Sequence, residues 1–338
     1  MSSPIVLTLD DPRWTSFVES RPEATPFHHP AWTQLLADCY GFRGFAFAVV
    51  DGEEIVVGIP VVEVRGPTRR KRWVALPFTD ALAPLGPAEH IPSLAAALDS
   101  ERRAAGAVSL EVHGALPQGA QSVHGWSHVV RLRPDPDEVF RTFKRVRQTI
   151  ARAVRAGVTI RVGETEDDLL EVFYGLHLLT RRRLGVPIQP RRFFRLLWER
   201  ILTQGLGTLL IAEVGGRLAA AEVYLHWNGT AIGKFNASDQ RMWGAHPNDA
   251  LIWEAIRRSC EAGLREFDFG RTDKENEGLR AFKARWGTEE HVLVYTAVDG
   301  AHAPAGSGWL GSALSAVIRH SPPWVCRTLG ERLYRYAA

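Results

Sequence analysis

Two aspartates stand where short apolar segments end, a position from which proteins often present a reactive carboxylate. Asp268 alternates with Phe267 and Phe269, so in an extended segment its side chain faces away from both rings. Asp80 follows a comparable segment in the first half of the chain. A carboxylate so placed can take a proton from a substrate, although an aspartate that pairs with Arg271 to fix a turn fits the pattern equally well. Asp268 and Asp80 are therefore candidate catalytic residues.

Other polar residues occupy strand positions nearby. Lys234 and Asn236 share one face of a strand expected over residues 231–237 and could line a substrate cleft, although exposed strand positions are polar in any case. Glu222 and His226 share a face of the preceding strand, where a lone histidine is more often structural than catalytic. Lys234 and Asn236 are accordingly candidate substrate-binding residues, whereas Glu222 and His226 receive no role.

The elements that must position these residues occur twice along the chain. Residues 45–64 and 208–227 each predict two strands joined by a tight turn that contains glycine. A helix precedes each hairpin, and a strand, a helix and a short strand follow it. The offset between the halves is 164 residues from Gly52 to Gly216, which predicts a duplicated unit. The remaining elements are predicted at residues 31–39, 72–78, 91–105 and 108–114 and at residues 191–202, 231–237, 249–262 and 264–270, with Asn248 as the cap of the last helix.

The two halves meet at residues 133–137, where two prolines disfavour continuation of a strand or a helix. We expect an N-terminal domain over residues 1–134, a C-terminal domain over residues 135–300 and a helical tail over residues 301–338. From the boundary to Gly157 the chain predicts one amphipathic helix. Its apolar side carries Val139, Phe143, Val146, Ile150 and Ala153, and its basic side carries Arg141, Lys144, Arg145, Arg147, Arg152 and Arg155.

The tail from residue 308 onward predicts two short helices separated at Pro322-Pro323. Each helix has a narrow apolar stripe, for which docking onto the protein core is the simpler explanation. Four arginines accompany the stripes, so peripheral contact with an anionic membrane surface stays open as an alternative.

The composition is that of a globular chain of about two domains. Its 338 residues are 45% hydrophobic and 23% charged, and the formal net charge of +3 is too small by itself to indicate a nucleic-acid-binding protein. Cys39, Cys260 and Cys326 lie far apart, which argues against a disulfide framework and against a zinc site. The N-terminus lacks the pattern of a signal peptide, and no apolar stretch reaches the ~18 residues of a membrane span. We therefore expect a cytoplasmic protein without a bound metal.

Three motifs in the second half carry a resemblance to a known family. Residues 267–272 (FDFGRT), followed by residues 278–283 (GLRAFK) and Trp286-Gly287, resemble the end of the second domain in the FemABX-type aminoacyltransferases, where a strand and a glycine turn precede GL(Y/R)xFKxx(F/W)G. Residues 147–158 resemble the R-x-x-I-x-x-A-x-x-x-G-V helix of this family, and residues 180–183 resemble its T-x-x-R. In the first half, residues 76–80 (LPFTD) are similar to a strand-end segment of shorter FemAB-like proteins.

The resemblance implies a fold and an activity. The fold is an α/β (α+β) chain of two tandem GNAT-like domains, each a mixed central sheet flanked by helices, with a C-terminal helical tail. The activity is transfer of an aminoacyl group from aminoacyl-tRNA to an amine acceptor, in this family a peptidoglycan precursor. Aminoacyl-tRNA is then the donor substrate, and no cofactor is implied.

The same resemblance assigns roles to individual residues. Lys283, the lysine of the FK pair, is the candidate for stabilising the oxyanion that develops on the ester carbonyl. Arg183 is the candidate for binding acceptor phosphates, and Arg271 and Arg147 complete the substrate-binding candidates. Arg147 lies on the basic helix, which offers contacts to tRNA phosphates, although a solvated basic surface explains this helix equally well without the resemblance. The first-domain lysine of the family has no counterpart, because Trp32 is followed by residues 33–36 (TQLL). A small metabolite or a peptide is therefore a credible alternative acceptor.

Two other functions stay open. A CoA-dependent GNAT usually presents a (Q/R)xxGx(G/A) loop at a helix N-terminus, and residues 239–248 match it poorly, since they contain one glycine and continue with His246-Pro247. An acyl-CoA-dependent N-acyltransferase is the second hypothesis. The third is an inactive double-GNAT module that binds RNA or a protein partner.

Overall fold

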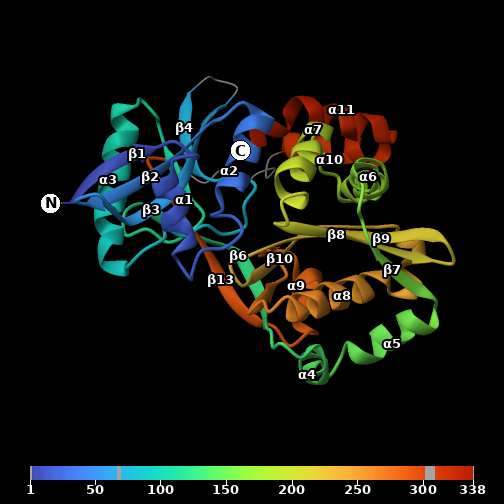
Figure 1. Ribbon diagram of the computed structural model, residues 1–338. Helices are drawn as coiled ribbons and strands as arrows, with labels where there is room; N and C mark the ends of the chain where they lie inside the picture. The colour runs from blue at the N-terminus through green and yellow to red at the C-terminus, as the bar shows by residue number, and fades with distance from the viewer. Residues whose placement is uncertain (1, 67–69, 301–308, 338) are drawn as a thin grey trace. The chain divides into compact units, whose positions relative to one another are not determined.

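The computed structural model describes residues 2–66, 70–300 and 309–337, which form two compact units (Figure 1). Unit 1 consists of the described residues within Met1–Trp126, Val292–Pro304 and Arg335–Ala338. Unit 2 consists of those within Ser127–His291 and Ala305–Tyr334. The domain limits expected at 134/135 and 300/301 stay predictions.

Unit 1 is built on a mixed sheet with the strand order β1-β2-β3-β4-β5-β13. The first four strands pair antiparallel, β4 pairs with β5 in parallel, and β5 pairs antiparallel with β13. Its elements are β1 (Ser2–Leu7), α1 (Pro12–Glu19), α2 (Pro30–Tyr40), β2 (Arg43–Asp51), β3 (Glu54–Arg65), β4 (Lys71–Ala75), η1 (Ala88–His90), α3 (Ile91–Ala104), β5 (Leu110–Val112), the first part of β6 (Ala120–Arg131) and the last part of β13 (Glu289–Val298).

Unit 2 has the strand order β6-β11-β10-β9-β8-β7. Four strands again pair antiparallel from β7 to β10, β10 pairs with β11 in parallel, and β11 pairs antiparallel with the end of β6. Its further elements are α4 (Pro136–Thr142), α5 (Arg147–Arg155), β7 (Val158–Val162), η2 (Asp168–Phe173), α6 (Tyr174–Leu184), α7 (Arg191–Leu197), η3 (Trp198–Leu202), β8 (Gly207–Val214), β9 (Arg217–Trp227), β10 (Thr230–Ser238), η4 (Gln240–Ala245), α8 (Pro247–Glu261), β11 (Glu266–Asp268), β12 (Thr272–Asp273), α9 (Glu277–Ala284), α10 (Trp309–His320) and α11 (Pro323–Leu333).

The duplication predicted from the sequence is confirmed by the strand pairings. In each unit an edge strand, two helices, an antiparallel hairpin, a third antiparallel strand, a helix and a short parallel strand follow one another. The parallel pairs are β4 with β5 and β10 with β11, as expected for a helix that connects two parallel strands. Both predicted hairpins are present, with their turns after Asp51 and after Val214.

The basic segment before Gly157 forms two helices and not the single helix that its periodicity predicts. All five apolar residues of the expected stripe are buried, as the amphipathic pattern requires. The helix stops at Thr142, because Phe143 adopts an extended conformation that places its ring edge-on to Trp253 and Trp286, with centroids 6.0 and 5.2 Å away. Packing of one large ring in the core therefore overrides the helical period here.

Two other expected boundaries are wrong. The last helix of the repeat begins at Pro247 with His246 as its cap, so Asn248 lies inside the first turn and does not cap it. Proline suits a first helical position because its missing N–H has no partner there in any case. The strand expected over residues 72–78 ends at Ala75, because Leu76 and Phe78 take positive φ angles of 54° and 61° and turn the chain.

The tail forms two helices around Pro322, and both pack against α6. Ile318, Cys326 and Gly330 are buried, with Cys326 and Gly330 against the segment that follows α6, whereas Val317 and Trp324 are exposed. The predicted docking of the tail is thus present, while residues 301–308 lie outside the described part of the chain. Within that described part, no helix combines the length and the apolar character needed to cross a bilayer.

Gly330 provides a test of the docked tail. A Cβ atom at this position would lie 1.9 Å from the carbonyl oxygen of Ile188, so Gly330→Ala must displace α11. We expect a loss of about 1–3 kcal/mol in the free energy of unfolding, measured by urea denaturation. Gly175→Ala in α6 is the matched control, because a Cβ there meets no atom within 4 Å, and it should leave stability unchanged or raise it by up to ~1 kcal/mol. Equal midpoints for both variants would contradict the docking of α11.

Candidate functional site

The turn that follows β11 is fixed by two of the predicted residues, Asp268 and Lys283. The Asp268 carboxylate accepts a hydrogen bond from the backbone N–H of Gly270 at 2.8 Å and another from the Ser127 hydroxyl at 2.9 Å. Gly270 itself has a φ of 72°, a conformation that side chains other than glycine rarely adopt. Asp268 therefore helps to hold a tight turn through Gly270 and Ser127, while its predicted pairing with Arg271 stays a prediction.

Lys283 reaches the same turn from α9. Its side chain is only 5% exposed, and Nζ donates to the carbonyl oxygens of Gly270 at 2.6 Å and Arg271 at 3.1 Å. The Arg271 guanidinium lies 2.9 Å from Asp273 in an ion pair. The structure thus brings Lys283, Asp268 and Arg271 together around one turn, with a buried positive charge at its centre.

Glu222 adds a buried carboxyl group to this region. It lies on β9 directly opposite Asn236 of β10, is 4% exposed, and accepts a hydrogen bond from Asn236 Nδ2 at 3.4 Å. Burial raises the pKa of Glu222 to about 7, against the opposing effects of the Asn236 hydrogen bond and the positive charge of Lys283. A carboxyl group with a pKa near neutrality is suited to accept and return a proton at physiological pH.

Space beside this carboxyl group is kept by Gly233. A Cβ atom on Gly233 would lie 2.9 Å from Glu222 Oε1. The register between β9 and β10 shifts between Gly233 and Phe235, which marks a bulge at Lys234 and interrupts the alternation expected between Lys234 and Asn236. Asn236 is exposed, so it connects the buried carboxyl group with the surface.

Buried polar atoms without a protein partner lie close to the same lysine. His128 is fully buried, and burial together with the nearby charge of Lys283 lowers its pKa to about 4, so the ring is neutral at pH 7. Within the described residues, neither His128 Nε2 nor Thr272 Oγ1 has a hydrogen-bond partner. Buried polar groups normally find one, so these two atoms are available to a ligand or to water.

The remaining candidates lie elsewhere. The Arg183 guanidinium on α6 stacks 4.6 Å from the Trp243 ring centroid, and the Trp243 indole donates to Ser238 Oγ at the end of β10. Arg147 is exposed at the start of α5. Asp80 belongs to unit 1, where its backbone carbonyl accepts a hydrogen bond from the Tyr295 hydroxyl at 2.8 Å. Of the other predicted residues, Lys283, Asp268 and Arg271 meet at the turn after β11, whereas Lys234 and Asn236 lie on the neighbouring strand β10.

Sequence reasoning left Glu222 without a role and did not consider His128 or Gly233. One signal for Glu222 was present, because it is the single charged residue in the apolar run from Leu218 to Leu225. A charge in the middle of a strand that is otherwise apolar predicts either a buried partner or a function. No comparable pattern in the sequence indicates the bulge that places Gly233 beside Glu222.

Comparisons with known proteins agree with this fold. Residues 141–284 match the family described as an acetyltransferase (GNAT) domain. No curated protein matches the chain. Among solved structures, FemX superimposes with a TM-score of 0.69 at 14% identity, over 87% of this chain and 96% of FemX.

Two further structures are similar at the level of the fold. L-PGS from Bacillus licheniformis has a TM-score of 0.58 at 14% identity, over 93% of this chain and 99% of that chain. A tandem GNAT protein from the clavulanic acid biosynthesis pathway has a TM-score of 0.57 at 15% identity, over 89% of this chain and 99% of that chain. The expected tandem GNAT fold and the resemblance to Fem-type proteins are thereby confirmed.

The raised pKa of Glu222 predicts a pH-dependent stability. Between pH 4.5, the ordinary pKa of a glutamate, and pH 7 the native state keeps a proton that the unfolded chain has released, so stability falls as the pH rises. Glu222→Gln stays neutral and should gain up to about 3 kcal/mol relative to the wild type between pH 4.5 and pH 8. Urea denaturation at several pH values measures this difference. Glu199→Gln, at an exposed position, is the control, and a difference for Glu222→Gln that does not change with pH would contradict a buried, raised pKa.

Proposed function

Residues 141–284 form an acetyltransferase (GNAT) domain within a Fem-like tandem fold, and on this basis we propose that the protein is a Fem-type aminoacyltransferase. It transfers an aminoacyl group from aminoacyl-tRNA to an amine acceptor, either a peptidoglycan precursor or a peptide-like metabolite. The observation that carries the proposal is a buried carboxyl group, Glu222, whose pKa is influenced by the charge of a buried ammonium group, Lys283, beside the space that Gly233 leaves.

These groups can perform the two tasks that the reaction sets. The acceptor nitrogen attacks the ester carbonyl carbon, and Glu222 takes the proton that the nitrogen must lose. Lys283 supplies a fixed positive charge for the developing oxyanion, together with the backbone of the turn that it holds. When the ester C–O bond breaks, the protonated Glu222 returns its proton to the leaving ribose oxygen. No covalent intermediate with the enzyme is required.

The surface of α4 and α5 supports a donor rich in phosphate. Arg141 lies 3.8 Å from Asp135 in an ion pair. By contrast, the described part of the chain places no carboxylate within 4.0 Å of five other exposed cations here: Lys144, Arg145, Arg147, Arg152 and Arg155. Unpaired cations gathered on α5 and on the loop before it favour contact with the phosphates of a tRNA.

Arg183 is the proposed contact for a phosphate on the acceptor. It is half-buried, burial lowers its pKa, and no described carboxylate lies within 4.0 Å of it. A cation that is partly removed from water and has no acid beside it favours an anionic ligand. Asp80, Lys234 and Asn236 remain candidates for the catalytic or substrate-binding roles predicted above.

An acyl-CoA-dependent N-acyltransferase is the second candidate, because the fold is shared with a tandem GNAT protein whose structure is described as being without AcCoA. The structure of the segment before α8 argues against CoA-dependent transfer. It forms the helix η4, in which Asp239 caps the first turn and pairs with Arg241, and it is not an open glycine-rich loop.

A cytoplasmic location and peripheral membrane contact through the exposed Trp324 of the tail belong to the proposal of an aminoacyltransferase.

A transfer assay tests the catalytic pair. The donor is bulk tRNA charged with radiolabelled amino acids, with acetyl-CoA as a parallel donor, and the acceptors are a nucleotide-linked muropeptide and a lysine-containing peptide. Glu222→Gln should lower the transfer rate by ~10²–10⁴-fold, and Lys283→Met by ~10²–10³-fold. In the wild type the rate should rise with pH up to about 7, where Glu222 loses its proton, and then level off.

Lys274→Met is the matched control, because Lys274 is exposed in the loop before α9 and should transfer at the wild-type rate. Thermal unfolding of each variant confirms that it is folded. Transfer that is unchanged in both Glu222→Gln and Lys283→Met would place the catalytic groups elsewhere.

A further inference from the structure

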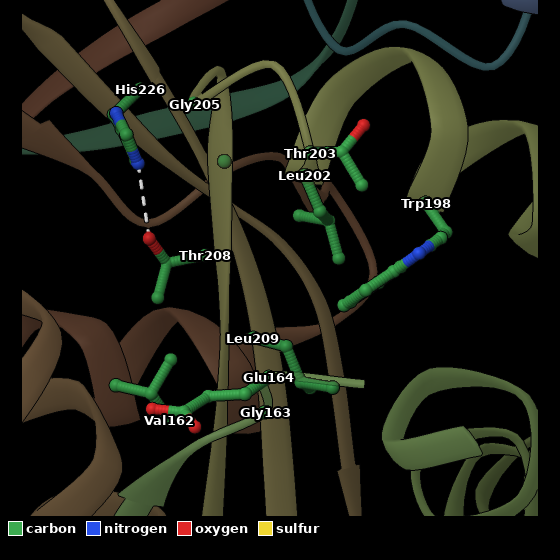
Figure 2. A pocket seen from close by; sticks show the side chains of 11 residues that line it. Val162, Gly163, Glu164, Trp198, Leu202, Thr203, Gly205, Thr208, Leu209 and His226 are labelled. Carbon is green, nitrogen blue, oxygen red and sulfur yellow. Dashed lines mark hydrogen bonds between the residues drawn. The ribbon is translucent and has the colours of Figure 1, made fainter. Parts of the chain in front are cut away.

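A cavity lies in unit 2, at the end of the sheet away from the Asn236 side. It has a volume of about 450 Å³ and is bounded by the ends of β7 and β8, by the turn η3 and by His226 near the end of β9 (Figure 2). His226 lies four residues beyond Glu222 on β9, about 13 Å along the strand, with Tyr224 between them. The cavity is therefore separate from the site proposed for acyl transfer.

The walls of this cavity are preformed. Gly163 has no room for a side chain, because a Cβ atom there would lie 2.4 Å from the Leu209 side chain. The loop that carries Glu164 is anchored by Asp168, which accepts hydrogen bonds from the backbone N–H groups of Glu164 and Thr165. These bonds and the ion pair with Arg161 lower the pKa of Asp168 to about 2, so the anchor stays charged. A site that needs no rearrangement loses little free energy on binding.

The lining combines apolar walls with few polar groups. Figure 2 shows Trp198 and Leu202 on one side of the cavity, with the His226–Thr208 pair on the other. His226 Nε2 and Thr208 Oγ1 are 3.0 Å apart, and burial lowers the pKa of His226, so this pair is uncharged at pH 7. Trp198 lies at the start of a π-helical turn, closed by the hydrogen bond from Thr203 N–H to its carbonyl oxygen. Such turns are rare and occur frequently at functional sites.

One charged residue lines the cavity. Glu164 is exposed at the cavity, and the described residues offer it no cation within 4.0 Å. An apolar slot with an indole wall and a single carboxylate is complementary to a molecule with a flat apolar body and one positive charge.

We propose that this cavity binds a small hydrophobic amine, with its apolar body against Trp198 and its ammonium group at Glu164. The site is independent of the proposed transferase activity and requires no chemistry from the protein.

Calorimetric titration with phenethylamine tests the proposal, with 2-phenylethanol as the matched neutral probe of the same shape. The wild type should bind the amine more tightly than the alcohol, and 0.5 M salt should reduce this difference because it screens the ion pair. Glu164→Gln should remove the preference, a change of ~5-fold for an exposed ion pair. Glu199→Gln, an exposed acid next to Trp198 that does not line the cavity, should bind like the wild type.

Trp198→Ala should weaken binding of both probes at least ~10-fold, because it removes the main apolar wall. If Trp198→Ala unfolds, Thr203→Trp provides a second test, since Thr203 is exposed at the cavity and the indole ring in its place would occupy the cavity. Equal affinity for amine and alcohol, no measurable binding by the wild type, or binding that survives a folded cavity variant would overturn the proposal.

Discussion

The parallel pairing between β10 and β11 ends early, and the candidate active site depends on that early end. β11 stops at Asp268, opposite Ile232, whereas β10 continues to Ser238. The chain leaves the sheet through a turn at Gly270 that the Asp268 carboxylate and the Lys283 ammonium group hold through its backbone. Because β10 continues beyond the end of β11, its bulge, Gly233 and Asn236 lie beside Glu222 where β11 no longer pairs with β10.

The same constraint places opposite charges in the core of unit 2. Burial disfavours the ionised form of Glu222 and the protonated form of His128. The positive charge of Lys283 lowers the pKa of both groups, so it opposes the effect of burial on Glu222 and adds to the effect of burial on His128. Unit 1 repeats the fold without this arrangement. Ala46 of β2 corresponds to Leu210 of β8 at the offset of 164 residues, and opposite Ala46 stands Pro60, whereas opposite Leu210 stands Glu222. The duplication thus assigns the carboxyl group, and with it the proposed chemistry, to unit 2.

The order of elements could be predicted from the sequence because turns, periodicity and the repeat all agree locally. The predicted element boundaries are wrong where one side chain or one backbone angle overrides the local pattern. Phe143 interrupts the expected helix, Leu76 and Phe78 end a strand, and Pro247 starts a helix two residues before its predicted start. Lys283 and Asp268 became candidates through motif and alternation, but the role proposed for Glu222 depends on its burial and on a bulge in the neighbouring strand. Such effects arise only when segments far apart in the chain pack together.

The central claim is that unit 2 accepts its acyl group from tRNA. The most direct measurement is the binding of bulk aminoacyl-tRNA at a series of salt concentrations. Acetyl-CoA and longer acyl-CoAs are measured under identical conditions. We predict tight tRNA binding whose affinity falls steeply with salt, a shallower salt dependence when Arg147, Arg152 and Arg155 are replaced by glutamine, and no response to the CoA compounds. Clear CoA binding without affinity for tRNA would contradict the account and assign the shared fold to CoA-dependent acyl transfer.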